Sequence, residues 1–230
     1  MIPLYHDFTG ETVLVFGGGS VGARKARRFA REARVVVVSP DFADRDFGGA
    51  ERVRAAPGPA DAGAWLDRAD PALVVAATDD PAVNDAVAEA ARARDVLINR
   101  ADRSESGEAA GGKDAGGDAT GRTVHGVIVP ATVDDGGVRV AVSTGGRSPA
   151  LAKYLRERIE SEIEGAGAMA DLTADLRAEL RGDGADPAAR RDAIRAVVRD
   201  PSVWKALRTG TSNPRREATR VIRNTMEGDR

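Results

Sequence analysis

A glycine-rich hexapeptide is the strongest chemical signal in this 230-residue sequence. Gly17-Gly18-Gly19-Ser20-Val21-Gly22 follows the pattern G-x-G-x-x-G. Gly17 would permit a tight turn, Gly19 would let a pyrophosphate approach the backbone, and Gly22 would let a helix pack closely on a strand. The phosphates would face the N-terminus of that helix, at Ser20 and Val21, where N–H groups and the helix dipole favour an anion.

The flanks of the motif decide whether it binds a ligand, because a short glycine motif is often only a flexible turn. Thr12–Phe16 is apolar and β-branched and predicts a buried strand that ends at the glycines. Residues 20–33 predict a helix, and Val35–Val38 predicts a second strand of the kind that parallel sheets bury on both faces. This strand–helix–strand order predicts a βαβ unit that binds a dinucleotide.

The end of the second strand bears on the choice of dinucleotide. An acidic residue normally binds the ribose there; Ser39 occupies the usual position, followed by Pro40, and Asp41 lies slightly beyond it. No arginine stands at this strand end in the sequence, which favours NAD over NADP.

Polar residues also follow the next expected strands at the same edge. Thr78 and Asp79 come after the strand Leu73–Ala77 and are candidates for cofactor contact, whereas Asp80 before Pro81 also suits a simple helix cap. Asn99 and Asp102 follow a strand at Val96–Ile98 and place a carboxylate near the expected nicotinamide site. From position alone, an ordinary loop aspartate is the favoured interpretation of Asp102.

Four regions follow from the pattern along the chain. Residues 1–102 alternate strand and helix and predict an α/β, Rossmann-like parallel sheet that binds NAD. Residues 103–122 are a low-complexity insertion with too little apolar surface to offset the entropy of ordering, which predicts a surface loop. Residues 123–150 predict a β hairpin, with strands at Val124–Pro130 and Val138–Ser143.

Residues 151–230 predict a helical C-terminal domain. Leu151, Leu155, Ile159 and Ile163 are spaced for one helical face, and a second stripe runs from Met169 to Leu180. Four dipeptides have the sequence of a helix cap followed by a proline in the first turn: Ser148-Pro149, Asp186-Pro187, Asp200-Pro201 and Asn213-Pro214.

Composition excludes several function classes. A formal net charge of −2 provides no global positive field for a nucleic acid. The chain has no cysteine, so disulfides, thiolate nucleophiles and cysteine-based metal sites are excluded. His6 and His125 show no ligand spacing, which leaves any metal site unknown. The sequence shows no basic and apolar leader pattern and no run of about 18 apolar residues, so we expect a soluble cytoplasmic protein without membrane contact.

The order of several motifs resembles the precorrin-2 dehydrogenase and sirohydrochlorin ferrochelatase family, the N-terminal region of siroheme synthases. The resemblance covers roughly residues 1–165. It rests on Pro3-Leu4-Tyr5, Val15–Gly19 with Arg24-Lys25-Ala26, Ala76–Asp80, Asn99 with Asp102, Val129-Pro130-Ala131, and Ser143–Ala152.

The resemblance implies NAD-dependent oxidation of precorrin-2 to sirohydrochlorin in siroheme and porphyrin-type biosynthesis, by a homodimer whose central region dimerises. It implies a catalytic role for Asp102 and leaves ferrochelatase activity uncertain. Asn99 and the turn Thr144-Gly145-Gly146-Arg147-Ser148 become candidates for binding the tetrapyrrole, whose rim carboxylates suit an arginine such as Arg147. Two departures from the family are the insertion, interpreted as inert rather than as a lid, and Ser143-Thr144 in place of a serine-rich turn.

Two alternatives remain at this point. An NAD-sensing regulatory module without catalysis would need the same first hundred residues, but it would not need Asp102 or the segment around Arg147. Another small-molecule dehydrogenase would be distinguished by the substrate that supports NADH formation.

Overall fold

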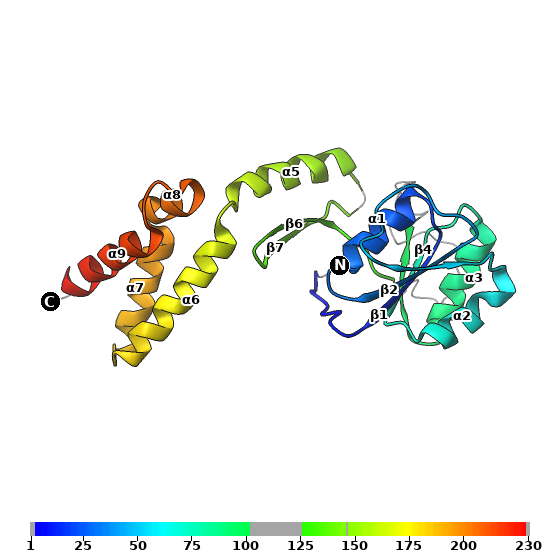
Figure 1. Ribbon diagram of the computed structural model, residues 1–230, viewed down its shortest axis with the longest axis horizontal. Helices are drawn as coiled ribbons and strands as arrows, with labels where there is room; N and C mark the ends of the chain where they lie inside the picture. The colour runs from blue at the N-terminus through cyan, green and yellow to red at the C-terminus, as the bar shows by residue number, and fades with distance from the viewer. Residues whose placement is uncertain (1–2, 102–125, 146, 229–230) are drawn as a thin grey trace. The chain divides into compact units, whose positions relative to one another are not determined.

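The computed structural model describes residues 3–101, 126–145 and 147–228, and its chain forms two compact units. The first unit extends to Val129 and also includes residues 145–147; the second comprises residues 130–144 and the chain from Ser148 onward. Figure 1 colours the first unit mainly from blue to green and the helices of the second from green to red.

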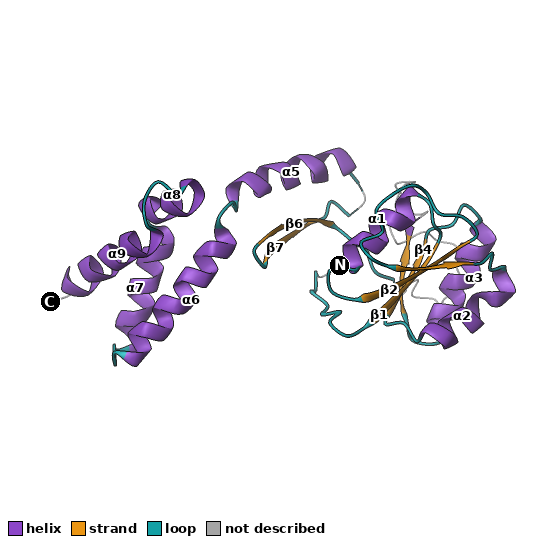
Figure 2. Cartoon of the chain, in the orientation of Figure 1, coloured by secondary structure: helices purple, strands orange, loops and turns teal. Residues whose placement is uncertain are grey.

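The first unit is a five-stranded parallel sheet with helices on its two faces (Figures 1 and 2). The strand order is β3-β2-β1-β4-β5, so the connections reverse direction between β1 and β4, where open α/β sheets bind ligands. The elements in chain order are β1 (Thr12–Phe16), α1 (Ser20–Phe29), β2 (Arg34–Ser39), β3 (Glu51–Arg54), the 3-10 helix η1 (Pro59–Asp61), α2 (Ala62–Ala69), β4 (Leu73–Ala76), α3 (Pro81–Arg92) and β5 (Leu97–Arg100).

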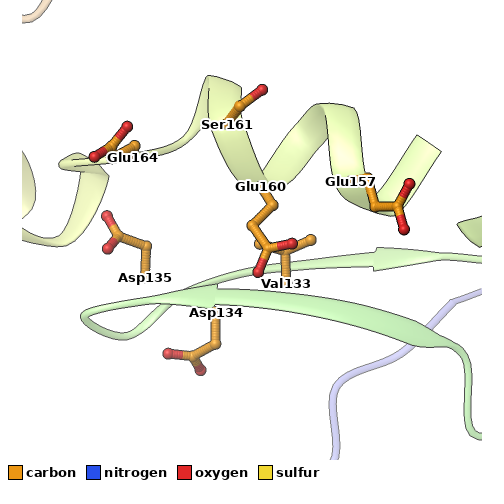
Figure 3. Close-up of a pocket in the computed structure, with 7 residues that line it drawn as sticks. All are labelled: Val133, Asp134, Asp135, Glu157, Glu160, Ser161 and Glu164. Carbon is orange, nitrogen blue, oxygen red and sulfur yellow. The ribbon is translucent and has the colours of Figure 1, made fainter. Parts of the chain in front are cut away.

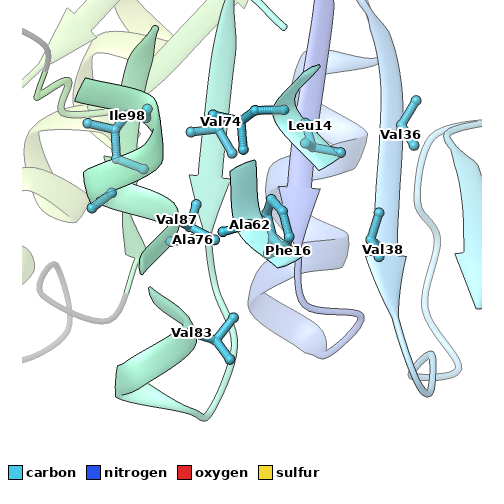
Figure 4. Close-up of a cluster of buried hydrophobic side chains, with 13 residues drawn as sticks. Leu14, Phe16, Val36, Val38, Ala62, Val74, Ala76, Val83, Val87 and Ile98 are labelled. Atoms are coloured by element: carbon cyan, nitrogen blue, oxygen red, sulfur yellow. The ribbon is translucent and has the colours of Figure 1, made fainter. Parts of the chain in front are cut away.

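Alternation along the central strands creates a core on each face of this sheet. Leu14 and Phe16 of β1 join a buried cluster with α2 and α3, shown in Figure 4. Val13 and Val15 of the same strand join a second cluster with α1. Each buried Val, Leu or Phe side chain contributes about 1.5–3 kcal/mol, so the sheet holds the loops at its carboxyl edge on a rigid base.

The predicted Rossmann-like fold is confirmed in this unit, with local corrections. The helix after the glycine motif ends at Phe29 rather than at Ala33. Two elements, β3 and α2, were absent from the sequence prediction. β3 lies at the edge of the sheet, where charged residues are common because they oppose aggregation, and it carries Glu51, Arg52 and Arg54. These charged residues interrupt the apolar pattern by which a strand is recognised in a sequence.

The predicted hairpin has a different first strand. Its strands are β6 (Ala131–Asp135) and β7 (Val138–Val142). Gly136 and Gly137 form the two-residue turn between them, since both have the positive φ that such a turn requires, 55° and 89°. Within Val124–Pro130 the structure describes residues from Gly126 onward. Gly126 bridges Ile98 in parallel, and the N–H of Val127 donates to the Ile98 carbonyl at 2.8 Å, so this segment extends the large sheet beside β5.

The second unit combines this hairpin with helices α5 (Pro149–Glu162), α6 (Ala166–Gly182), α7 (Pro187–Arg199), α8 (Pro201–Thr209) and α9 (Pro214–Gly228). The four predicted helix starts are confirmed: Ser148, Asp186, Asp200 and Asn213 each accept a backbone N–H of the following helix. The α6 stripe is also confirmed, since Met169 and Leu176 are buried with α7, α8 and α9.

Candidate functional site

The glycine loop lies between the carboxyl end of β1 and the start of α1, as predicted. A Cβ at Gly17 would lie 2.2 Å from the carbonyl oxygen of Ala77, and one at Gly22 would lie 1.9 Å from the carbonyl oxygen of Gly17. These two positions therefore exclude any side chain. Gly19 differs, because a Cβ built there would meet no described atom within 4 Å.

This contrast fits a dinucleotide. Gly17 and Gly22 allow the backbone to turn and the helix to pack, while the surface above Gly19 is open to a group that approaches the backbone. Gly19 is the N-cap of α1 and supplies no side chain to its N–H groups, and the first turn contains no acidic residue. Ser20 and Val21 thus begin a helix whose N-terminal N–H groups and dipole suit an anion.

The end of β2 lies beside this loop. The loop after β2 packs on the glycines, since the N–H of Ala43 donates to the Gly18 carbonyl at 2.8 Å. Ser39 is buried, whereas Pro40 and Asp41 are exposed. The Asp41 carboxylate accepts a hydrogen bond from Arg54 Nη1 at 2.8 Å.

The expectation that no arginine stands at this strand end is wrong. Arg54 ends β3 and is paired in register with Ser39, so the sheet brings it to the end of β2 although 13 residues separate it from Asp41. Sequence reasoning missed it because β3 itself was missed.

At the end of β4, Thr78 is held by a buried asparagine of α3. Asn84 Oδ1 accepts from the Thr78 N–H at 3.1 Å and from its hydroxyl at 2.8 Å, and Asn84 Nδ2 donates to the Thr78 carbonyl at 2.8 Å. Asp79 is exposed, and Asp80 caps α3 through the N–H of Ala82 at 2.8 Å. The sequence signal for Asn84 was a polar residue interrupting the apolar face of a predicted helix.

Asn99 is buried in β5 near the same edge. Its Nδ2 donates to the carbonyl of Val127 at 2.9 Å, while its Oδ1 is buried without a hydrogen-bond partner in the described part of the chain. Leaving a buried acceptor unsatisfied costs about 1–3 kcal/mol, so Asn99 Oδ1 is a candidate for accepting a hydrogen bond from a ligand.

The remaining predicted site residues divide into two groups. Asp102 and Gly146 lie outside the described residues. In the turn before α5, the Thr144 hydroxyl donates to the Ser148 carbonyl at 3.1 Å and accepts from the Ser148 N–H at 3.2 Å. Gly145 has a φ of 63°, and Arg147 is exposed.

A separate pocket in the second unit is lined mainly by carboxylates (Figure 3). Glu160 of α5 points towards the hairpin that carries Asp134 and Asp135, whereas Asp134 points away from the helix. Several of these carboxylates already have partners within the chain. Glu160 pairs with Arg156 at 2.7 Å, Asp134 pairs with Arg139 at 2.9 Å, and Asp135 accepts from the Gly167 N–H at 3.0 Å. This pocket contains none of the predicted site residues.

Within its described residues the chain has neither a cluster of metal ligands nor a membrane-spanning helix. Over 3–101, 126–145 and 147–228, no three His, Asp or Glu side chains converge closely enough to hold a metal ion. Over the same ranges, no helix has the length and apolar character needed to cross a membrane.

Family comparisons match both units of the chain. The family described as "Putative NAD(P)-binding" matches residues 4–112, which contain the glycine loop and the edge described above. The family described as "Sirohaem biosynthesis protein central" matches residues 135–162, which contain β7 and α5. The predicted family resemblance is confirmed.

Similar proteins of known name include a siroheme synthase of Stutzerimonas stutzeri, which is 34% identical over 236 residues and matches 99% of this chain but 44% of its own length. The chain thus spans less than half the length of the siroheme synthases that it resembles. A precorrin-2 dehydrogenase of Methanosarcina barkeri is 27% identical and matches 90% of this chain and 86% of its own length.

A solved structure named "SirC, precorrin-2 dehydrogenase" has the same fold. It superposes with a TM-score of 0.63 at 23% identity and covers 97% of this chain and all of its own. The predicted combination of a parallel sheet, a small β region and a helical C-terminal part is therefore confirmed.

Proposed function

We propose that this chain oxidises precorrin-2 to sirohydrochlorin in siroheme synthesis, with NAD as the hydride acceptor. The observation that supports a dinucleotide cofactor is the contrast within the glycine loop. Gly17 and Gly22 have no room for a side chain, whereas the space at Gly19 is open. The substrate rests on the similarity to siroheme synthases and to a precorrin-2 dehydrogenase. When bound, the nicotinamide takes a hydride from the reduced macrocycle.

The cofactor would be held along the carboxyl edge of the sheet. Ser20 and Val21 begin the helix that receives the pyrophosphate. Ser39, Pro40 and Asp41 would contact the adenosine ribose, and Asp41 supplies the carboxylate that favours NAD. Thr78, fixed by Asn84, and the exposed Asp79 would contact the cofactor nearer its nicotinamide end.

The substrate would be bound by residues at the end of β5 and by the turn before α5. Asp102 follows β5 and would accept the proton that the macrocycle releases as the hydride leaves, so that two hydrogens are removed in total. Asn99 Oδ1, a buried acceptor with no partner among the described residues, would accept from a ligand donor at this edge. Thr144, Gly145, Gly146, Arg147 and Ser148 would bind the carboxylates on the rim of the tetrapyrrole, chiefly through the Arg147 guanidinium.

The deciding experiment supplies precorrin-2 and NAD to the full chain without oxygen and records NADH and the visible spectrum of the macrocycle. NADH formed in proportion to sirohydrochlorin supports the proposal. Addition of ferrous ions then reports chelation separately, since ferrochelatase activity is left open. Tight NAD binding without any turnover of precorrin-2 would favour the NAD-sensing alternative.

We also propose that the chain is a homodimer formed through its central region. The β6–β7 hairpin has only two strands, too few to form a stable core by itself. None of the residues of α5, Pro149–Glu162, is buried, and its Leu151 and Tyr154 side chains are 47% and 53% exposed. The four-region division at residues 102, 122 and 150 and the cytoplasmic location remain predictions.

A further inference from the structure

The end of β3 places an arginine where the adenosine ribose of a dinucleotide would lie. Arg54 Nη1 donates to Asp41 Oδ1 at 2.8 Å and to the Pro40 carbonyl at 3.0 Å. In this fold, an acidic residue about 20 residues after the glycine motif binds the ribose 2′-hydroxyl of NAD, whereas a nearby arginine accommodates the 2′-phosphate of NADP. This strand end contains both kinds of residue.

A second cation lies on the same side of β3. The guanidinium carbon of Arg52 is 5.8 Å from the centroid of the Phe42 ring, and that of Arg54 is 5.9 Å from the same ring. Two guanidinium groups, those of Arg52 and Arg54, therefore lie close to Phe42, and one of them contacts the Asp41 carboxylate. These two guanidinium groups would attract a phosphate added to the ribose beside Asp41.

The Asp41–Arg54 ion pair is weak enough to open. The side chains are 91% and 70% exposed, and exposed ion pairs contribute little to stability. A guanidinium can bind a phosphate through two parallel hydrogen bonds, which are stronger than its single bond to Asp41. Exchange of one partner for the other therefore carries no large penalty.

We propose that Arg54 is a specificity-determining residue that allows this chain to bind NADP as well as NAD. With NAD, Arg54 stays on Asp41, whose carboxylate accepts from the ribose hydroxyl. With NADP, Arg54 leaves Asp41 and donates to the 2′-phosphate, and Arg52 adds attraction. The inference rests on the proposed function, since it concerns the cofactor of the same site.

The test measures dissociation constants by calorimetry for NAD and NADP with the full chain and two variants. We expect the wild type to bind the two within about tenfold of each other. Arg54→Gln should weaken NADP by about tenfold, the effect of losing a charged hydrogen bond at an exposed site, and should change NAD by less than about threefold. Asp41→Asn should shift the ratio the other way, because it removes the repulsion and releases Arg54.

Arg34→Gln is the matched control. Arg34 pairs with Glu51 at 2.7 Å across the same two strands, but at their amino ends, and both side chains are exposed. It therefore makes the same change of charge away from the proposed site and should leave the NADP to NAD ratio unchanged. Adenosine 2′,5′-bisphosphate and adenosine 5′-monophosphate differ only in the 2′-phosphate and contain no nicotinamide. Arg54→Gln should weaken binding of the bisphosphate more than binding of the monophosphate.

The outcomes separate this inference from the function on which it rests. Undetectable NADP binding by a wild type that binds NAD, or equal weakening of both by Arg54→Gln, would overturn the role of Arg54 and leave the dehydrogenase proposal intact. If Arg34→Gln changed the NADP to NAD ratio as much as Arg54→Gln does, the effect would come from long-range charge alone. That result would also overturn the specific role of Arg54. Failure of the wild type to bind either dinucleotide would overturn the proposed function itself.

Discussion

Asn84 satisfies the backbone of Thr78 on both sides: it accepts the Thr78 N–H and hydroxyl through Oδ1 and donates to the Thr78 carbonyl through Nδ2. Asn84 is 1% exposed, so these bonds form in the protein interior, where an unpaired partner is costly. One helix residue thereby fixes the turn that ends β4. Since Ala77, next to Thr78, also closes over Gly17, the same contact supports the glycine loop.

Asn84→Ala should weaken both stability and cofactor binding. It leaves the Thr78 N–H and carbonyl without their partner, which should lower the free energy of unfolding by about 1–3 kcal/mol. The dissociation constant for NAD should rise about tenfold because the turn is no longer fixed. Thr78→Val removes the hydroxyl contacts with Asn84 and with the Asp80 carbonyl but keeps both backbone bonds to Asn84, so it should have a smaller effect on stability and on NAD affinity. Denaturant unfolding measures the first quantity and calorimetry the second. Loss of stability with unchanged NAD affinity would make Asn84 purely structural.

Two glycines of the loop should respond in opposite ways to alanine. Gly22→Ala places a Cβ 1.9 Å from the Gly17 carbonyl oxygen and should destabilise the fold by about 1–3 kcal/mol or more. Gly19→Ala points a methyl group into open space and should leave the melting temperature nearly unchanged. It should nevertheless weaken NAD binding by at least about tenfold, because the methyl group occupies the approach of the pyrophosphate. NAD affinity unaffected by Gly19→Ala would refute the placement of the phosphates.

Local signals in the sequence predict the glycine turn correctly, whereas residues that reach this edge from a distant part of the chain were missed. Gly17, Ser20 and Gly22 follow from a strand, a turn and a helix that are contiguous in the chain. Arg54 could not be found in this way, because only the parallel pairing of β2 and β3 brings it to Asp41. The prediction of the first hairpin strand was wrong for a local reason. Ala131–Asp135 contains several polar residues, so the more apolar run before it matched the strand pattern better.

Dimerisation should depend on the exposed apolar face of α5. Leu151→Glu combined with Tyr154→Glu should convert a dimer to a monomer in light scattering at micromolar concentration, since burying either carboxylate in an interface is unfavourable. Val198→Glu on α7 is the control, because Val198 is also an exposed apolar residue, at 40%, but lies outside the central region. A monomeric wild type would contradict the proposed dimer, and dissociation by Val198→Glu would move the interface to α7.

Asp200 should make the helical unit sensitive to acid. The Ser202 hydroxyl donates to Asp200 and, with the N–H groups of Ser202 and Val203 and the charge of Arg220, holds the pKa of this carboxyl below its ordinary value of 3.8. A lowered pKa in the folded state stabilises the protein above that ordinary value and loses this contribution as the pH falls through the folded-state pKa.

Asp200→Asn tests this directly because asparagine still caps α8 but carries no charge. The variant should be less stable than the wild type by up to about 1 kcal/mol at neutral pH, and the difference should shrink towards pH 3. With Trp65 replaced by phenylalanine in both proteins, Trp204 of α8 is the remaining tryptophan and reports urea unfolding of this unit. A difference that stays constant with pH would show that the charge of Asp200 does not contribute.

Asp102→Asn should fold and bind NAD as the wild type does but lose most precorrin-2 oxidation. The change keeps the size of the side chain and removes its negative charge, so it tests chemistry rather than packing. If Asp102 accepts the substrate proton, kcat should fall by about 10²–10⁴-fold, the usual contribution of a positioned acid–base group. If it only orients the macrocycle through pyrrole N–H groups, KM should rise together with a smaller fall in kcat. Wild-type kcat and KM in the variant would leave Asp102 an ordinary loop aspartate, and the proton acceptor would then have to be sought elsewhere on the sheet edge, beginning with Asp79, which is exposed beside Thr78.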